Sequence, residues 1–309
     1  RSEPDHGQNR ETVERLGHGP CGPYRSGRRK GRPRPCYNPL RLSSGCNKDS
    51  SLPETPPRLH VLVARAAPRA VVIRRGPSRY ASTYLWDLRD DSLQTGQCLR
   101  ARIYERRCDL SPNGDYLIYF AYNDRWWSET RGSWTAISLA PYVKALTLYA
   151  AGGTWGGGGV FVDNKSYRLN DRFPIGHDLL FDRSDLVCVG RGLPPSRWGD
   201  ASLAVYFTRL ARDGWRLNAS LSHEHIQVFE KPWRKDMALR KYCHRGKGPR
   251  PGGLFTDSHA LISSGDEVAA FDLWEWADIV GDRLAWAEGG RIYATASSGF
   301  DPRAPKSAA

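Results

Sequence analysis

The side chains best suited to bind a charged partner are concentrated in residues 231–253, KPWRKDMALRKYCHRGKGPRPGG. Lysines and arginines dominate this segment, and Trp233 and Tyr242 stand among them. Basic side chains neutralise phosphates and aromatic rings stack on bases, so the pattern predicts binding of nucleic acid or another polyanion. The candidate residues are Lys231, Arg234, Lys235, Arg240, Lys241, Arg245 and Lys247. A solvated insertion loop between two strands is the favoured interpretation, because runs of charge commonly serve solubility alone.

A second segment that could hold a ligand is the glycine-rich stretch AGGTWGGGGVFVD, residues 151–163. A Walker-type phosphate loop requires Lys followed by Ser or Thr after its glycines, and none follows here. A dinucleotide-binding loop opens a helix, whereas Val160, Phe161 and Val162 are typical of a strand. We therefore interpret the glycines as a tight turn, in which Trp155 packs beside a bare backbone.

The sequence contains no motif for nucleophilic catalysis: G-x-S-x-G is absent, and no cysteine is paired by spacing with a histidine and an acid. His223 and His225 would share one face of a strand, but two histidines alone rarely make a metal site. We expect no catalytic residues, no metal site and no cofactor, and a protein that is not an enzyme.

Short β-strands joined by tight turns are expected to position these segments. Tryptophan and tyrosine are frequent (11 and 14 residues), methionine occurs once, and the chain has 31 glycines and 21 prolines. This composition is typical of an all-β domain with many turns. After a first hairpin around Ala66 and Pro68, further hairpin turns are expected at Asn113-Gly114, Asp163-Asn164, Asp213-Gly214, Ser264-Gly265 and Gly289-Gly290.

The first four of these later turns recur about every 50 residues, which is the spacing of propeller blades. Residues 58–300 are therefore predicted to form one all-β, propeller-like domain of about five blades. The alternative is a β-sandwich of similar length.

The two ends of the chain differ from this domain. Residues 1–57 are basic, rich in Gly, Pro and Ser, and lack apolar periodicity, which predicts a disordered arm. Residues 301–309 are expected to be a flexible end. The 309-residue chain has a formal charge of +13, and no apolar run is long enough to cross a bilayer. Its seven scattered cysteines favour a reducing compartment, so a cytoplasmic location is predicted.

One hairpin carries a resemblance to a known family. The segment CDLSPNGDYLIYF, residues 108–120, resembles the S-P-D-G blade hairpin of TolB-like propellers, with Asn113 where aspartate is usual. More broadly, residues 58–300 resemble uncharacterised bacterial proteins with hairpins of this kind. The resemblance implies a propeller fold, and nothing about catalysis follows from it.

The function expected from the sequence is that of a non-enzymatic interaction platform for a protein partner. Two alternatives remain open. One is nucleic-acid or polyanion binding through residues 231–253, and the other is an enzyme whose site lies on the propeller axis. A membrane partner is not expected.

Overall fold

The computed structural model describes residues 40–41, 57–76, 79–171, 177–195, 198, 202–246, 248–249 and 253–296. The chain divides into residues 1–35 and 36–309, and all the described residues belong to the second unit. The expected disordered arm and flexible end lie outside the described residues, except for Leu40–Arg41 and Pro57.

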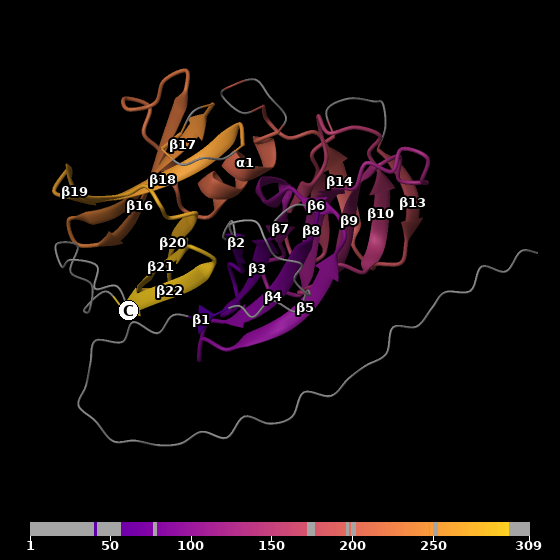
Figure 1. Cartoon of the computed structure of the whole chain (residues 1–309), viewed down its shortest axis with the longest axis horizontal. Coiled ribbons are helices and arrows are strands. Elements are labelled where there is room, and N and C mark those ends of the chain that lie inside the picture. Colours follow the sequence, from indigo (N-terminus) through magenta and orange to yellow (C-terminus); the bar gives the residue numbers. More distant parts are fainter. Residues whose placement is uncertain are drawn as a thin grey trace, which may run out of the picture. The chain divides into compact units, whose positions relative to one another are not determined.

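The described residues form five β-sheets, which confirms the all-β, propeller-like fold and excludes the sandwich of two sheets (Figure 1). The first sheet has the order β2-β3-β4-β5 and consists of β2 (Arg58–Val63), β3 (Arg69–Arg75), β4 (Ala81–Asp87) and β5 (Leu93–Leu99). The second sheet contains β6 (Arg102–Ile103), β7 (Asp109–Leu110), β8 (Tyr116–Tyr122), β9 (Ser133–Leu139), β10 (Ala145–Ala150) and β13 (Asp178–Asp182). A 3-10 turn, η1 (Glu105–Arg107), lies between β6 and β7.

The third sheet is the smallest and contains the only parallel pair among the described strands, β12 with β14. It consists of β11 (Gly159–Phe161), β12 (Ser166–Leu169) and β14 (Val187–Arg191). The fourth sheet has β15 (Arg216–Leu217), β16 (Ile226–Arg234), β17 (Met237–Arg245), β18 (Phe255–Ser263) and β19 (Asp266–Phe271). The fifth has β20 (Trp276–Val280), β21 (Arg283–Glu288), β22 (Arg291–Ala296) and β1 (Leu40–Arg41).

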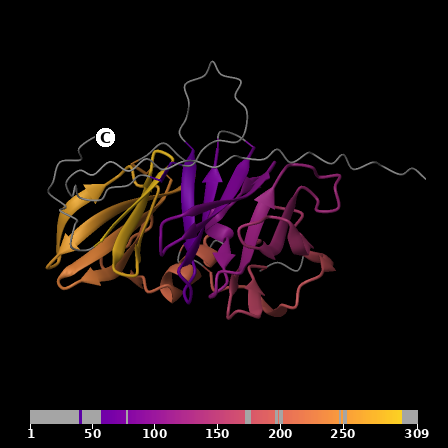
Figure 2. The ribbon, with the colours of Figure 1, turned by 90° about the horizontal axis from the view of Figure 1, so that it is seen from below.

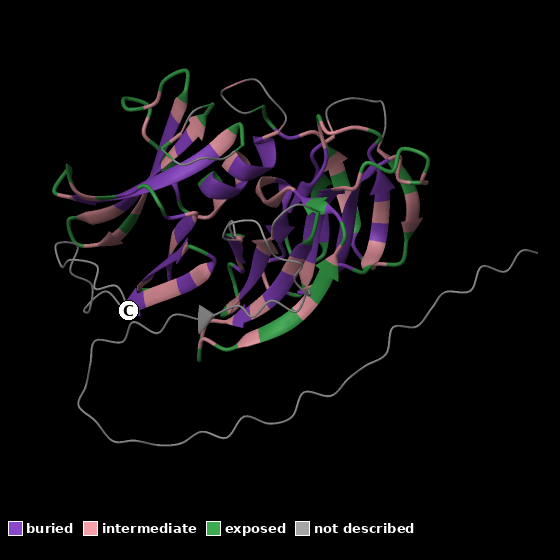
Figure 3. Ribbon diagram, viewed as in Figure 1, coloured by how far each residue is buried: buried purple, intermediate pink, exposed green. Residues whose placement is uncertain are grey.

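The first sheet contacts the second, the second contacts the third, and the fourth contacts the fifth, while helix α1 (Ala204–Arg212) lies between the third and fourth; β2 also contacts β20 and β21 of the fifth sheet (Figure 2). The alternation of side chains along β2 explains this arrangement. Leu59 and Val61 pack with Trp276 and Ala285 of the fifth sheet, whereas Leu62 packs into the cluster of the second sheet. Buried residues are concentrated between the sheets (Figure 3), so each interface resembles the face-to-face packing of two blades.

Five of the six expected hairpin turns are confirmed by antiparallel pairs: β2–β3, β7–β8, β11–β12, β18–β19 and β21–β22. At the S-P-N-G turn, the hydroxyl of Ser111 accepts a hydrogen bond from the Tyr116 N–H (2.9 Å), and Gly114 has a positive φ of 78°. Positive φ favours glycine, so the local sequence determines this turn.

The hairpin expected at Asp213-Gly214 is wrong. Residues Ala204–Arg212 form the helix α1, and Gly214 follows it with a φ of 91°. Leu203, Tyr206 and Leu210 recur at helical spacing and are all buried, so this face packs against the fourth and fifth sheets. Helical spacing of the apolar residues outweighed the turn signal here.

Candidate functional site

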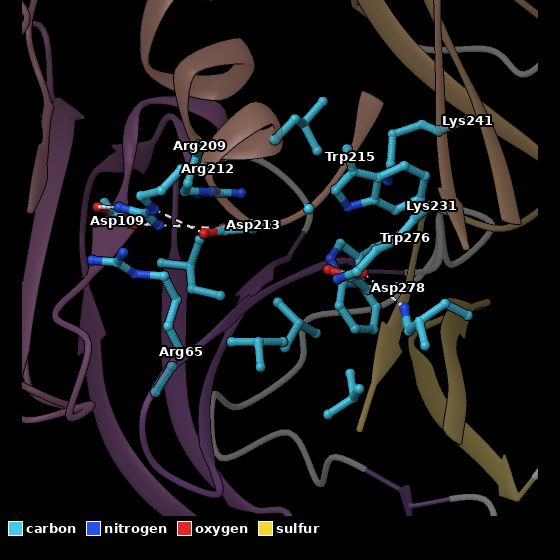
Figure 4. A pocket seen from close by; sticks show the side chains of 18 of the residues that line it. Arg65, Asp109, Arg209, Arg212, Asp213, Trp215, Lys231, Lys241, Trp276 and Asp278 are labelled. Atoms are coloured by element: carbon cyan, nitrogen blue, oxygen red, sulfur yellow. Dashed lines mark hydrogen bonds and ion pairs between the residues drawn. The ribbon is translucent and has the colours of Figure 1, made fainter. Parts of the chain in front are cut away.

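A cavity of about 440 Å³ is lined by residues of β2, β7, α1, β16, β17 and β20 and of the segments that follow β2 and α1 (Figure 4). The strands among these elements come from four of the five sheets, which therefore converge on the cavity, and we name it the axial cavity. Charged side chains line two opposite sides of it, and apolar side chains lie between them. We name the two sides the arginine wall and the lysine wall.

The arginine wall consists of Arg65, Arg209, Arg212, Asp109 and Asp213. The buried carboxylate of Asp109 accepts two hydrogen bonds from Arg212, at 2.6 and 2.9 Å, and one from the N–H of Phe161 at 2.8 Å. The Nε of Arg212 also donates to Asp213, at 2.8 Å. Helix α1 therefore fixes its two arginines against the β7 end of the second sheet.

Arg209 has neutral partners. Its guanidinium donates to the carbonyl of Cys108 and lies 3.0 Å from the Nε2 of His60. Its side chain is only 6% exposed. A buried cation is stabilised by nearby negative charge; Asp213 already interacts with Arg209 electrostatically, and an anion in the cavity would add to that.

The lysine wall consists of Lys231, Lys241 and Asp278, with Trp215 and Trp276 beside them. Lys231 donates to Asp278 at 2.7 Å. The Nζ of Lys241 contacts His259 (3.1 Å) and the carbonyl of Ala277 (3.2 Å), and lies 4.7 Å from the centre of the Trp215 ring. Both lysines come from the paired strands β16 and β17, which hold their side chains in place.

Burial changes the acidity of both walls. It lowers the pKa of the Lys241 ammonium, and it raises the pKa of the Asp213 carboxyl although Arg212 opposes that shift. Each effect arises because a low-dielectric environment disfavours the charged form. An anion bound between the walls would oppose the effect of burial on the pKa of Lys241.

His60, which contacts Arg209 of the arginine wall, gives the protein a measurable pH dependence. Burial, reinforced by the charge of Arg209, lowers the pKa of His60 well below its ordinary value of 6.5. The folded protein therefore holds His60 neutral, whereas the unfolded chain binds a proton below that pH. Stability is expected to fall as the pH drops below 6.5, by up to about 1.4 kcal/mol per pH unit. Urea unfolding between pH 8 and pH 5 measures this slope.

The His60→Gln variant should lose this part of the slope, while His223→Gln, at an exposed histidine, should keep it. An unchanged slope in His60→Gln would show that another group titrates. Glu105 causes a separate loss of stability at lower pH, where its carboxylate becomes protonated in the folded protein. Burial opposes its ionisation, but Arg75 and Arg106 outweigh burial and lower its pKa to about 2, from 4.5.

The structure places the candidate polyanion-binding residues in different environments. The expected loop at 231–253 is wrong for most of its length, because β16 and β17 pair through residues 226–245. Lys231 and Lys241 line the axial cavity, and Lys241 is only 1% exposed. Arg240 is ion-paired with Glu230 at 2.7 Å. These three side chains therefore do not form an open basic surface.

The remaining candidates lie near the ends of the hairpin. Arg234 stacks on Trp233 with its guanidinium carbon 4.2 Å from the ring centre, while Lys235 and Arg245 are exposed. Lys247 lies outside the described residues. Polyanion binding by this set stays a prediction, and it now depends on Arg234, Lys235 and Arg245. Titration of RNA binding with salt tests it, because each phosphate contact steepens the salt dependence.

The sequence analysis missed the arginine wall. Asp109 precedes the S-P-N-G turn, whereas Arg209 and Arg212 lie in a segment that the sequence assigned to a hairpin. No motif or spacing in the sequence indicated that these residues would meet. The apolar spacing that forms α1 was the available signal, since it places Arg209 and Arg212 within one helical turn.

Other candidate chemistry is limited in the part of the chain that the structure describes. No group of three or more His, Cys, Asp or Glu side chains is placed to hold a metal ion there. His223 and His225 do not share a strand face, because the chain turns after His223 and His225 is one of the turn residues; their ring centres are 6.4 Å apart. Within the same residues, no helix has the length and apolarity that crossing a bilayer requires.

Comparison with known proteins adds no family. No protein-family model matches the sequence, and no curated protein matches it. Among solved structures, the β-propeller domain of the Trilobed protease from Pyrococcus furiosus is similar over 79% of this chain and 70% of its own, with 8% identity and a TM-score of 0.26. Kuenenia stuttgartiensis hydrazine synthase is similar over 79% of this chain and 76% of its own, with 10% identity and a TM-score of 0.25. The assignment of this chain as propeller-like therefore rests on its own five sheets.

Proposed function

We propose that this protein is a non-enzymatic binding platform whose axial cavity takes a small organic dicarboxylate. One observation carries the proposal: each wall of the cavity has one more cation than carboxylates. The arginine wall has three arginines and two aspartates, and the lysine wall has two lysines and one aspartate. A ligand with an acidic group at each end would match both walls.

The space between the walls suits the body of such a ligand. Val61, Leu210, Ile279 and Val280 are buried apolar residues of the cavity lining. Trp215 and Trp276 add flat apolar surface beside the lysine wall. A cavity of about 440 Å³ is in the size range of small-molecule sites, so the shape supports a compact ligand rather than a polymer.

The bonding of the cations supports the same ligand. Lys241 and Arg209 are both buried, and the hydrogen bonds described above join them to carbonyl oxygens and histidines. A ligand carboxylate would provide charge-assisted hydrogen bonds, which are stronger than those to neutral acceptors. The wall ion pairs, Arg212 with Asp109 and Lys231 with Asp278, would keep their geometry.

Calorimetric titration with adipate and with hexanoate tests the proposal, because the two acids have equal carbon counts and differ in one carboxylate. We expect adipate to bind about 10-fold more tightly or better. Arg65→Gln, at an exposed position of the cavity lining, and Lys231→Gln should each weaken adipate binding by a similar factor, whereas Arg89→Gln, an exposed arginine outside the lining, should not. Equal binding of the two acids, or no binding at millimolar concentration, would overturn the proposal.

A protein partner and a cytoplasmic location complete the proposed role. Among the residues that the structure describes, Cys108, Cys188 and Cys243 carry free thiols. Free thiols support a reducing compartment. The edges and turns of the five sheets supply the surface that a partner protein would use.

A further inference from the structure

A second cavity, of about 290 Å³, lies at the opposite end of β2 from the mouth of the axial cavity. Its lining includes Arg58, where β2 begins, while the axial cavity takes residues 61–65 from the other end of that strand. The two cavities share no lining residue. Five arginines line the second cavity, Arg58, Arg75, Arg102, Arg106 and Arg107, against one carboxylate, Glu105. We name it the arginine pocket.

The guanidinium groups of this pocket are held in place by their contacts. Arg107 donates to the carbonyl of Gly156 (2.6 Å) and to the Ser202 hydroxyl (2.9 Å). Arg75 pairs with Glu105 at 2.5 Å, and Arg106 pairs with Asp257 at 3.2 Å. Fixed arginines bind a phosphate at a smaller entropic cost than mobile ones, so the pocket is prepared for an anion.

Arg102 differs from these neighbours because it is exposed and lies over an aromatic ring. Its guanidinium carbon is 4.6 Å from the centre of the Tyr104 ring. The guanidinium carbon of Arg107 also lies near this ring, 5.1 Å from its centre. A guanidinium positioned over an aromatic ring keeps its N–H donors in its plane, directed outward. Arg102 can therefore receive an anion that enters the pocket from solvent.

The glycine segment adds an aromatic surface to the rim. Trp155 lines the pocket and is 78% exposed, so the expectation that it packs beside a bare backbone is wrong. Leu254, also 62% exposed, lies on the same lining. Large aromatic side chains are mostly buried in folded proteins, and an exposed indole beside arginines is the arrangement by which proteins stack a base next to its phosphate.

We propose that the arginine pocket binds a nucleotide, with its phosphate on the arginines and its base stacked on Trp155. The volume, at the lower limit for small-molecule sites, fits a phosphorylated mononucleotide whose base lies over the rim. The turn of the glycine segment thus has a second consequence: it presents Trp155 and the carbonyl of Gly156 on the side that faces Arg107. This site does not depend on the axial cavity or on its ligand.

The test is calorimetric titration of the full chain with AMP, adenosine and inorganic phosphate. We expect AMP to bind at least 10-fold more tightly than either part alone. Trp155→Ala should reduce AMP binding about 10-fold and leave phosphate binding unchanged, whereas Arg102→Ala should weaken both. The matched controls are Trp127→Ala, at an indole 84% exposed elsewhere, and Arg89→Ala, which should change neither.

Three results would overturn the proposal. They are the absence of AMP binding at millimolar concentration, equal affinity for AMP and phosphate, and AMP binding that Trp155→Ala leaves intact. Adipate, the probe of the axial cavity, should not compete with AMP. Failure of one site is therefore distinguishable from failure of the other.

Discussion

Replacing Asp109 by alanine is expected to lower the free energy of unfolding by about 3 to 5 kcal/mol. The Asp109 carboxylate is buried and joins three elements: its own strand β7, the end of α1 through Arg212, and β11 through the Phe161 N–H. The alanine variant leaves the half-buried Arg212 with Asp213 as its remaining carboxylate and leaves the Phe161 N–H without this acceptor. Chemical denaturation of both proteins measures the difference.

Asp115→Ala is the matched control for this experiment. Asp115 is also paired with an arginine, Arg69, at 2.9 Å, but both side chains are more than 40% exposed. An exposed pair of this kind contributes about 1 kcal/mol or less. If Asp109→Ala lowered the free energy of unfolding no more than Asp115→Ala does, the buried pair would not be what joins α1 to the second and third sheets.

The turns of this fold could be predicted from the sequence because their determinants are local. Gly114 needs a positive φ, and the Ser111 hydroxyl reaches a backbone N–H five residues away, so one short motif contains the whole interaction. The same holds for the turns at Gly265 and Gly290, which also have positive φ. Such turns, together with strands whose side chains alternate between two faces, predict an all-β fold built from hairpins.

The walls of the axial cavity could not be predicted in this way. Asp109 and Arg212 are 103 residues apart, and Lys231 and Asp278 are 47 apart, so each ion pair exists only after the sheets have packed. The basic segment at 231–253 illustrates the opposite error. Its local charge suggested one surface, but strand pairing directs Lys241 inward and leaves Lys235 in solvent.

Both proposed sites bind an anionic ligand, and they lie at opposite ends of β2. Arg58 begins β2 at the arginine pocket, and Arg65 follows its end at the axial cavity. Between them, His60 contacts Arg209 of the arginine wall, and it also lies near Glu105 and Arg106, which line the arginine pocket. A ligand phosphate near Arg106 would therefore change the field at His60. The pH dependence assigned to His60 provides an internal probe of that effect.

Gly158→Ala is expected to destabilise the protein by about 3 kcal/mol or more, because two costs combine. A Cβ at this position would lie 1.9 Å from the carbonyl oxygen of Arg107, and the residue has a φ of +77° that an alanine adopts only under strain. The clash displaces either η1 or the glycine segment, so nucleotide binding at the arginine pocket should weaken as well. Thermal unfolding and AMP titration of the same sample measure both effects.

Gly153→Ala separates this effect from a general intolerance of the glycine segment. Nothing lies within 4 Å of a Cβ built on Gly153. Alanine there should change stability by about 1 kcal/mol or less and leave AMP binding unchanged. If the two variants were equally stable, close packing of Gly158 against η1 would not be the reason for this glycine. If Gly153→Ala also lost AMP binding, the mobility of the loop, rather than the position of Trp155, would govern the site.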